Sequence, residues 1–110
     1  MMIEGIILTP LKRIEVKGGN VLHAMKKTDT GFKGFGEAYF SMIEHDVVKA
    51  WKQHLEMTVN LVVPHGKVRF VMFDDRPGSS TRQKFQVVDL SKQNYCRLTV
   101  PPLVWFGFQG

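Results

Sequence analysis

The fold is decided by the stretch MTVNLVVPHGKVRFVMF, residues 57–73. Residues 57–63 form an apolar run rich in β-branched side chains, and the Pro-His-Gly sequence that follows is typical of a turn. Residues 67–73 start as alternating polar and apolar positions and end as a continuous apolar run, which is the pattern of a buried strand. The stretch therefore predicts two strands separated by a turn.

The same period of two continues on both sides of this stretch. We expect loops where turn-forming residues cluster, at residues 74–80 and 91–94. No segment longer than about ten residues carries the apolar stripe of a helix. Eight or nine short strands predict an all-β sandwich or a jelly-roll barrel, in a single domain spanning residues 1–110. The further strands are expected at residues 5–8, 20–25, 36–42, 47–54, 82–90, 95–98 and 104–108.

Composition excludes several classes of protein. No apolar stretch reaches the roughly 20 residues that a membrane helix needs, and the N-terminal residues lack the features of a secretory signal. Cys96 is the only cysteine, which excludes an internal disulfide and a thiolate metal cluster. We interpret Cys96 as a small, half-buried filler and expect a cytoplasmic protein. The apolar run at residues 105–108 needs cover, from a partner subunit or from the remainder of a longer fold.

The net charge of +5 and the pI near 9.6 raise the question of nucleic-acid binding. The lysines and arginines are scattered along the chain, however, and no aromatic ladder of an RNA-binding module accompanies them. Most of these charges are therefore interpreted as solvated surface. The more specific alternative is that a few of these lysines and arginines bind phosphate. We expect neither a nucleic acid nor a membrane as partner.

Cationic and titratable side chains occur within the apolar strand predicted at residues 47–54. Lys52 and His54 share one face of such a strand, because successive side chains point to opposite faces. If that face lines the inside of a barrel, the two groups point into one concave space near Lys49. This arrangement predicts a site for an anionic or carbonyl-bearing small molecule.

Several short motifs follow one another between about residue 29 and residue 110. They are Glu37-Ala38-Tyr39-Phe40-Ser41, Val48-Lys49-Ala50-Trp51, Gly66-Lys67-Val68, Asp74-Asp75-Arg76, Leu90-Ser91 with Asn94, Leu98-Thr99-Val100-Pro101-Pro102 and Phe106-Gly107-Phe108. In this ordered set of motifs the sequence resembles the dTDP-4-dehydrorhamnose 3,5-epimerase family. The members of that family are cupin jelly rolls that act on nucleotide-linked 4-keto-6-deoxy sugars. The resemblance implies a homodimer, no metal and no organic cofactor.

The sequence departs from the family at the positions that carry its chemistry. The family's L-R-G-x-H-x-Q stretch brings an arginine and the catalytic histidine into the barrel. By the resemblance, Lys49 takes the arginine position, Lys52 the histidine position and His54 the glutamine position. A second family histidine corresponds to Phe106, and a family lysine corresponds to Val59. The family's catalytic tyrosine and the aspartate that supports the histidine have no match.

Epimerisation next to a ketone needs a base for the α-proton and a group that stabilises the enolate. A protonated Lys52 could stabilise an enolate or hold a phosphate, whereas a lysine made neutral by burial could act as the base or form a Schiff base. His54 is the alternative base, although an isolated strand histidine is often only structural. We also expect substrate contacts from Glu37 and Trp105, whose simpler interpretations are an outward-facing glutamate and a core or interface aromatic residue.

Other candidate groups have simpler interpretations. Arg76 is expected to pair with the neighbouring carboxylates of its loop rather than with a ligand. His45 and His65 are expected to be exposed. A cupin metal site requires a His-x-His pair followed by a glutamate and a later histidine. Too few of these ligands are present in the sequence, and we therefore expect no metal.

Two functional hypotheses follow. The first is an epimerase or isomerase of the cupin type that binds a nucleotide-activated 4-keto-6-deoxy sugar in deoxysugar or surface-polysaccharide biosynthesis, with Lys52 in place of the usual histidine. The alternative is a catalytically inactive relative that binds sugar nucleotides or serves a structural role. The missing histidine, tyrosine and aspartate favour the alternative, whereas the ordered motifs favour the same class of substrate in both.

Overall fold

The strands predicted on either side of residues 64–66 are present, and they belong to different sheets. In the computed structural model, which describes residues 2–110, the turn at residues 62–67 carries the chain from one sheet to the other. The described residues form nine strands and no helix. The strands are β1 (Ile7–Pro10), β2 (Arg13–Ile14), β3 (Val21–Leu22), β4 (Val48–Lys52), β5 (Val59–Leu61), β6 (Val68–Asp74), β7 (Phe85–Leu90), β8 (Cys96–Val100) and β9 (Val104–Gln109).

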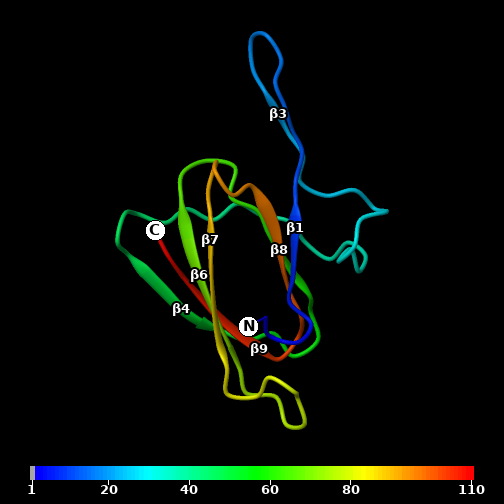
Figure 1. Cartoon of the computed structure of the whole chain (residues 1–110), viewed down its shortest axis with the longest axis vertical. Helices are drawn as coiled ribbons and strands as arrows, with labels where there is room; N and C mark the ends of the chain where they lie inside the picture. The colour runs from blue at the N-terminus through cyan, green and yellow to red at the C-terminus, as the bar shows by residue number, and fades with distance from the viewer. Residues whose placement is uncertain (1) are drawn as a thin grey trace.

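Two antiparallel sheets form the body of the molecule. One has the strand order β1-β8-β5 and the other β4-β9-β6-β7, while β2 and β3 form a hairpin of their own. Figure 1 shows the two larger sheets facing each other and the hairpin projecting from one end. The all-β jelly-roll architecture expected from the sequence is therefore confirmed. No helix long and apolar enough to cross a bilayer occurs within residues 2–110.

The hydrophobic core lies between the two sheets. The alternation along each strand sends one set of side chains inward, so that β6, β7, β8 and β9 all contribute to one cluster. Each fully buried aliphatic or aromatic side chain in such a cluster stabilises the fold by about 1.5–3 kcal/mol. The inward side chains of these four strands include Phe70, Met72, Val88, Leu90, Leu98, Val100, Val104 and Phe106.

The C-terminal apolar run does not need a partner for cover, contrary to expectation. Strand β9 is a central strand between β4 and β6, and Phe106 is only 4% exposed. The run is apolar because it is a core strand with neighbours on both sides. Cys96 is 7% exposed, so it is buried rather than half-buried.

Several strand boundaries differ from the prediction. Residues 36–42 form no strand, because their alternating pattern finds no neighbouring strand within the chain. The strand predicted at residues 20–25 is reduced to β3, and residues 82–84 lie in a turn before β7. Sequence periodicity reports which residues could alternate across a sheet, whereas a strand also requires a partner for its backbone hydrogen bonds.

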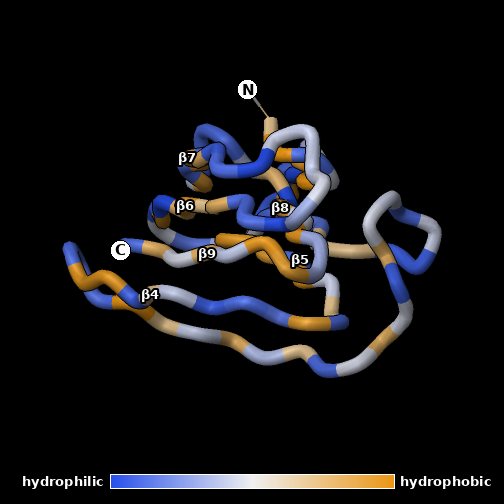
Figure 2. The backbone as a smooth tube through the Cα atoms, turned by 90° about the horizontal axis from the view of Figure 1, so that it is seen from below, coloured by the Kyte–Doolittle hydropathy of each residue, from blue (hydrophilic) through white to orange (hydrophobic). Residues whose placement is uncertain are grey.

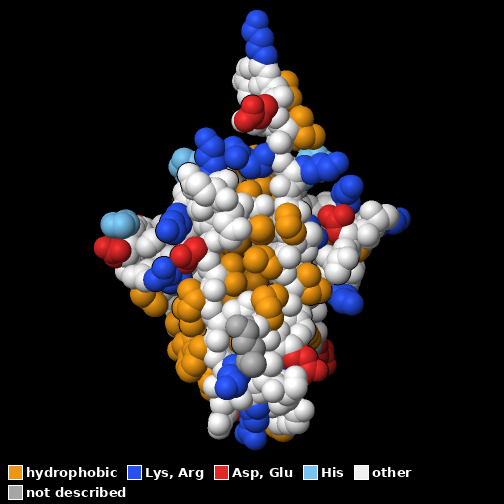
Figure 3. Space-filling view, in the orientation of Figure 1, with side chains coloured by type: hydrophobic (Ala, Val, Ile, Leu, Met, Phe, Trp, Pro, Cys, Tyr) orange, Lys and Arg blue, Asp and Glu red, His pale blue; other side chains and the backbone are white. Residues whose placement is uncertain are grey.

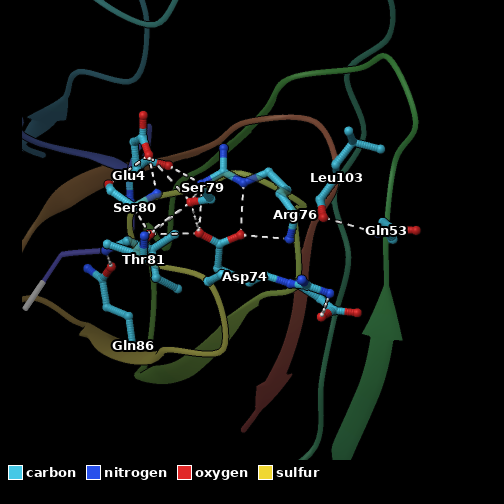
Figure 4. Close-up of polar contacts among 12 residues, drawn as sticks. Glu4, Gln53, Asp74, Arg76, Ser79, Ser80, Thr81, Gln86 and Leu103 are labelled. Carbon is cyan, nitrogen blue, oxygen red and sulfur yellow. Dashed lines mark hydrogen bonds and ion pairs between the residues drawn. The ribbon is translucent and has the colours of Figure 1, made fainter.

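A buried ion pair fixes the loop between β6 and β7. The Asp74 carboxylate is fully buried and accepts hydrogen bonds from Arg76 at 2.9 Å and from the hydroxyls of Ser79 and Thr81 at 2.6 Å (Figure 4). Arg76 also donates to the backbone carbonyl of Glu4, which ties the loop to the N-terminal segment. The predicted pairing of Arg76 with an acidic neighbour is thus confirmed for Asp74.

A second buried cation fixes the segment that follows the hairpin. Arg97 lies on β8, is fully buried, and points to the outer side of the three-stranded sheet, opposite its core neighbours in β8. Its guanidinium donates to the carbonyl of Ala24 at 2.6 Å, to the carbonyl of Thr30 at 3.0 Å and to the carboxylate of Asp29 at 3.2 Å. The chain from residue 24 to residue 30 is therefore held against this sheet.

Beyond this anchor, residues 33–44 form an extended arm. In Figure 2 the arm is the outermost layer of the molecule and leads to the turn before β4. Its large apolar side chains are exposed to an unusual degree, with Phe35 at 81%, Phe40 at 95% and Met42 at 88%. The three most exposed large hydrophobic side chains of residues 2–110 therefore lie on the arm.

Candidate functional site

The candidate site is built on β4, the edge strand of the four-stranded sheet. Lys49 pairs with Phe108 and Lys52 pairs with Phe106, so three steps along β4 match two steps along β9. One extra residue on one strand of an antiparallel pair is a β-bulge. Directly paired residues point to the same face, and Phe106 and Phe108 pack in the core. The bulge therefore turns both lysines to the inner face of the sheet.

Gly107 permits the bulge. A Cβ atom at Gly107 would lie 2.7 Å from the Cβ of Ala50, closer than real Cβ atoms come to a neighbour. The same atom would lie 3.2 Å from the backbone carbonyl oxygen of Lys49. Only glycine at this position lets β4 approach β9 in this conformation, and so the glycine sets the direction of both lysines.

Both lysines are exposed, although they leave the strand on its inner face. The reason is that β4 is an edge strand, with a neighbouring strand of its sheet on one side only. The ammonium of Lys49 donates a hydrogen bond of 2.9 Å to the carbonyl of Met42 in the arm. Lys52 has no hydrogen bond or ion pair to another side chain within residues 2–110, which leaves its ammonium available to a ligand.

His54 follows the end of β4 and is half-buried. The centroid of its ring lies 6.1 Å from that of Phe106, so the imidazole is beside the same core residue that pairs with Lys52. Backbone contacts hold this segment: His54 accepts a hydrogen bond of 2.8 Å from the amide of Leu103, and Gln53 donates one of 3.0 Å to the carbonyl of Leu103 (Figure 4). Lys52 and His54 therefore both lie next to Phe106 of β9.

Trp105 is not part of this group. It alternates with Phe106 on β9 and pairs with Phe73 of β6, so its side chain lies on the outer face of the four-stranded sheet. Trp105 therefore does not lie beside Lys52 in this chain, and its contact with a substrate stays a prediction. Neighbours in sequence on one strand cannot both face the interior, and Phe106 takes the inward position.

Glu37 lies on the extended arm and is exposed. The arm reaches the candidate site only through Met42, whose carbonyl accepts the hydrogen bond from Lys49. Glu37 is therefore connected to the site through the arm and forms no hydrogen bond or ion pair with Lys52 or His54. Contact of Glu37 with a substrate therefore stays a prediction.

The remaining histidines and possible metal ligands lie apart from one another. His45 is exposed and lies 3.3 Å from the carboxylate of Asp46, as expected, and His65 is exposed in its turn. No group of three or more His, Cys, Asp or Glu side chains that could hold a metal ion is present among residues 2–110.

Chemically, the site combines two ammonium groups and one imidazole at the open edge of a barrel. The ammonium groups can neutralise a phosphate or a developing enolate, and an imidazole is a group that can act as a general base or acid. No carboxylate is hydrogen-bonded to His54 within the described residues, in contrast to the supported histidine of the resembling family. Sequence reasoning missed Met42 and Leu103, because their roles depend on how distant segments pass the site.

The comparisons with known proteins agree with this architecture. No protein-family model matches the chain. The crystal structure of a dTDP sugar isomerase from Desulfovibrio desulfuricans superposes with a TM-score of 0.95, at 40% identity over 98% of this chain and 69% of that one. A sugar 3,4-ketoisomerase from Thermoanaerobacterium thermosaccharolyticum, crystallised with TDP, shares the fold at a TM-score of 0.75 and 20% identity, over 98% of this chain and 73% of that one.

One curated protein is also similar in sequence. It is a probable low-salt glycan biosynthesis epimerase of Haloferax volcanii, 32% identical over 73 residues, which are 66% of this chain and 47% of the relative. The chain thus spans about half the length of this relative. Given the 40% identity to the isomerase over nearly the whole chain, the shared fold and the ordered motifs, the chain belongs to the family of cupin dTDP-sugar isomerases and epimerases related to dTDP-4-dehydrorhamnose 3,5-epimerase.

Proposed function

We propose that the inner face of β4 binds a nucleotide-activated 4-keto-6-deoxy sugar. The observation that carries the proposal is the bulge opposite Gly107, which turns Lys49 and Lys52 to the same face, next to His54. Two cations beside an imidazole suit a ligand with a diphosphate and a ketone. Membership of a family of dTDP-sugar isomerases supports the same class of ligand. By the same analogy, the protein would act in deoxysugar or surface-polysaccharide biosynthesis, and its free thiol fits the cytoplasm.

In the catalytic form of the proposal, His54 is the base. Neutral His54 removes the proton from the carbon next to the ketone, and the electron pair moves to the ketone oxygen as an enolate. The ammonium of Lys52 stabilises that oxyanion. In an epimerisation, a water molecule on the opposite face of the enolate donates a proton to the same carbon, and His54 releases its proton to solvent. In an isomerisation, the protonated His54 returns its proton to the neighbouring carbon on its own face, by way of the enediol. Neither course consumes a cofactor.

The second candidate function is binding without turnover. Three observations favour it: Lys52 is exposed and so lacks the burial that a lysine base needs, Phe106 fills the position of a family histidine, and no described carboxylate supports His54. The same pocket would then hold the sugar nucleotide as a binding or structural relative of the enzymes.

Proton exchange separates the two candidates. The protein is incubated in heavy water with dTDP-4-keto-6-deoxyglucose, and deuterium incorporation next to the ketone is followed by proton NMR. Exchange above the buffer rate that is lost in His54→Asn supports catalysis. Binding without exchange supports the second candidate. If Lys52→His then creates exchange, the remaining site is competent, and if the ligand does not bind at all, both candidates are wrong.

We also propose that the protein is a homodimer in which the arm at residues 33–44 is covered by a second copy. The arm carries large exposed apolar side chains next to the site, and contiguous apolar surface of this kind marks interfaces. Coverage by a second copy would also bury the open edge at β4. Glu37, which lies on the arm, would then contact the ligand of its own or of the second subunit.

A further inference from the structure

A cleft lies at the end of the barrel that carries the hairpin, away from β4. Its volume is about 550 Å³, and it lies between the β2–β3 hairpin, the turn between β5 and β6, and the loop between β7 and β8. None of the residues proposed above to bind the sugar nucleotide lines it. Figure 3 shows lysine and arginine side chains gathered at the base of the hairpin.

The charged side chains that line this cleft are basic. Arg13, Lys67, Lys92 and His65 contribute to its walls, and no Asp or Glu among the described residues does. Arg13 and Lys92 form no ion pair within residues 2–110. Lys67 lies near Asp89, whose pKa is lowered first by Arg69 and further by Lys67, so part of its charge is already compensated. Arg13 and Lys92 are therefore the two uncompensated cations.

The walls are held in place by the fold. The hydroxyl of Tyr95 donates a hydrogen bond of 2.7 Å to the carbonyl of His23, and the carbonyl of Tyr95 accepts one of 3.0 Å from Leu11. Burial raises the pKa of Tyr95, and the nearby charge of Arg13 opposes that rise, which shows that the two side chains are close. On the other side of the cleft, the side-chain amide of Asn94 donates a hydrogen bond of 2.8 Å to the backbone carbonyl of Asp89. This bond closes the loop between β7 and β8.

We propose that this cleft binds the phosphate or diphosphate group of a small molecule, with Arg13 and Lys92 as its principal ligands. A preformed space of this volume is in the usual range for small-molecule sites, about 300–1,000 Å³. Cations without competing carboxylates select an anion, and Asn20, Ser91 and Gln93 add polar groups that can hydrogen-bond to phosphate oxygens. Leu22 and Pro64 provide an apolar wall for the remainder of such a molecule.

The proposal is independent of the proposed function, and inorganic pyrophosphate is the probe that tests it. Its affinity is measured by calorimetry for the wild type and for three double variants: Arg13→Gln with Lys92→Gln in the cleft, Lys49→Gln with Lys52→Gln on β4, and Lys27→Gln with Lys84→Gln on exposed surface. Each pair removes two positive charges. The thermal midpoint of each variant shows that it is folded.

The cleft pair should weaken pyrophosphate binding at least about tenfold, because two charge-assisted contacts are lost. The surface pair should change it less than threefold, that is by less than about 0.7 kcal/mol. The β4 pair should leave this binding event in place, because pyrophosphate bound at Lys49 and Lys52 would be a separate event from binding in the cleft. Equal weakening by the surface pair would show that only net charge matters and would overturn the proposal. It is also overturned if the wild type does not bind pyrophosphate or if only the β4 pair abolishes binding, and the latter result would leave the sugar-nucleotide proposal intact.

Discussion

Asp74 is the residue whose chemistry the fold changes most clearly. The guanidinium of Arg76, and then the hydroxyls of Ser79 and Thr81, hold the pKa of this carboxyl well below its usual range, against the opposing effect of burial. The sequence predicted the pairing because the two residues are close in the chain. It did not predict the two hydroxyls or the contact of Arg76 with Glu4, which depend on how the loop folds over the N-terminal segment.

Replacing Asp74 should destabilise the protein. In Asp74→Asn the carboxylate charge is lost and Arg76 is left partly buried without a counterion, which we expect to lower the free energy of unfolding by about 3 kcal/mol. Urea denaturation at pH 7 measures this. The matched control is Asp75→Asn, an exposed pair with Arg82 at 3.6 Å, which should change stability by less than about 0.5 kcal/mol. Equal effects of the two changes would contradict the assigned role.

The same ion pair predicts a pH dependence. Because the pKa of Asp74 is lower in the folded than in the unfolded state, its stabilising contribution is complete above the unfolded value of about 3.9. That contribution is lost as the pH falls below this value towards the folded pKa. Urea denaturation between pH 5 and pH 2 should therefore show a steeper loss of stability for the wild type than for Asp74→Asn. If the free energy of unfolding falls with pH equally in both proteins, the Asp74 carboxylate is not the source of this pH dependence.

At the scale of elements, the buried strands and the loops between them were predictable, whereas the bulge in β4 and the course of the arm were not. Buried central strands such as β6 combine alternation with apolar runs, so their sequence alone identifies them. The bulge in β4 is invisible to a strict period of two, which places Lys49 and Lys52 on opposite faces. The arm at residues 33–44 alternates like a strand but has no strand beside it in this chain. The conformations of β4 and of the arm therefore depend on which strand lies beside each of them, and not on the local sequence pattern.

The bulge can be tested through Gly107. Gly107→Ala places a methyl group 2.7 Å from the Cβ of Ala50 and should push β4 away from β9, lowering both stability and affinity for the sugar nucleotide. Overpacking of this kind costs about 1–3 kcal/mol. Adding Ala50→Gly removes the closest contact and should recover part of both losses. A Gly107→Ala variant with full affinity would show that the bulge does not set the direction of the lysines.

The anchor of the arm can be tested through Arg97. Lysine has one ammonium and cannot replace the planar guanidinium that reaches Ala24, Thr30 and Asp29 together, so Arg97→Lys should cost about 2 kcal/mol. Hydrogen exchange of the amides at residues 24–32 should accelerate more than that of β6. If exchange accelerates equally in both regions, Arg97 stabilises the whole fold and has no special role at the arm.

At the scale of the whole molecule, the apolar surface left open by the fold points to self-association. Sequence reasoning placed that surface at residues 105–108, but these residues form a central strand, and the uncovered surface lies on the arm. A hydrophobic residue in a sequence cannot reveal whether its own chain covers it. We expect wild-type protein to be dimeric in sedimentation equilibrium, and Phe40→Ser, which removes a ring that is 95% exposed, to shift it towards monomer. Val16→Ser on the hairpin is the control and should leave the dimer unchanged.

The central claim is that the inner face of β4 holds a sugar nucleotide, and it is tested most directly by calorimetric titration of dTDP-4-keto-6-deoxyglucose. The wild type is compared with Lys49→Gln plus Lys52→Gln and with the control pair Lys27→Gln plus Lys84→Gln, which removes the same charge from exposed surface. We predict at least about a tenfold loss of affinity in the first pair and less than threefold in the control. Equal affinity in all three proteins, or an equal loss in both pairs, would contradict the claim.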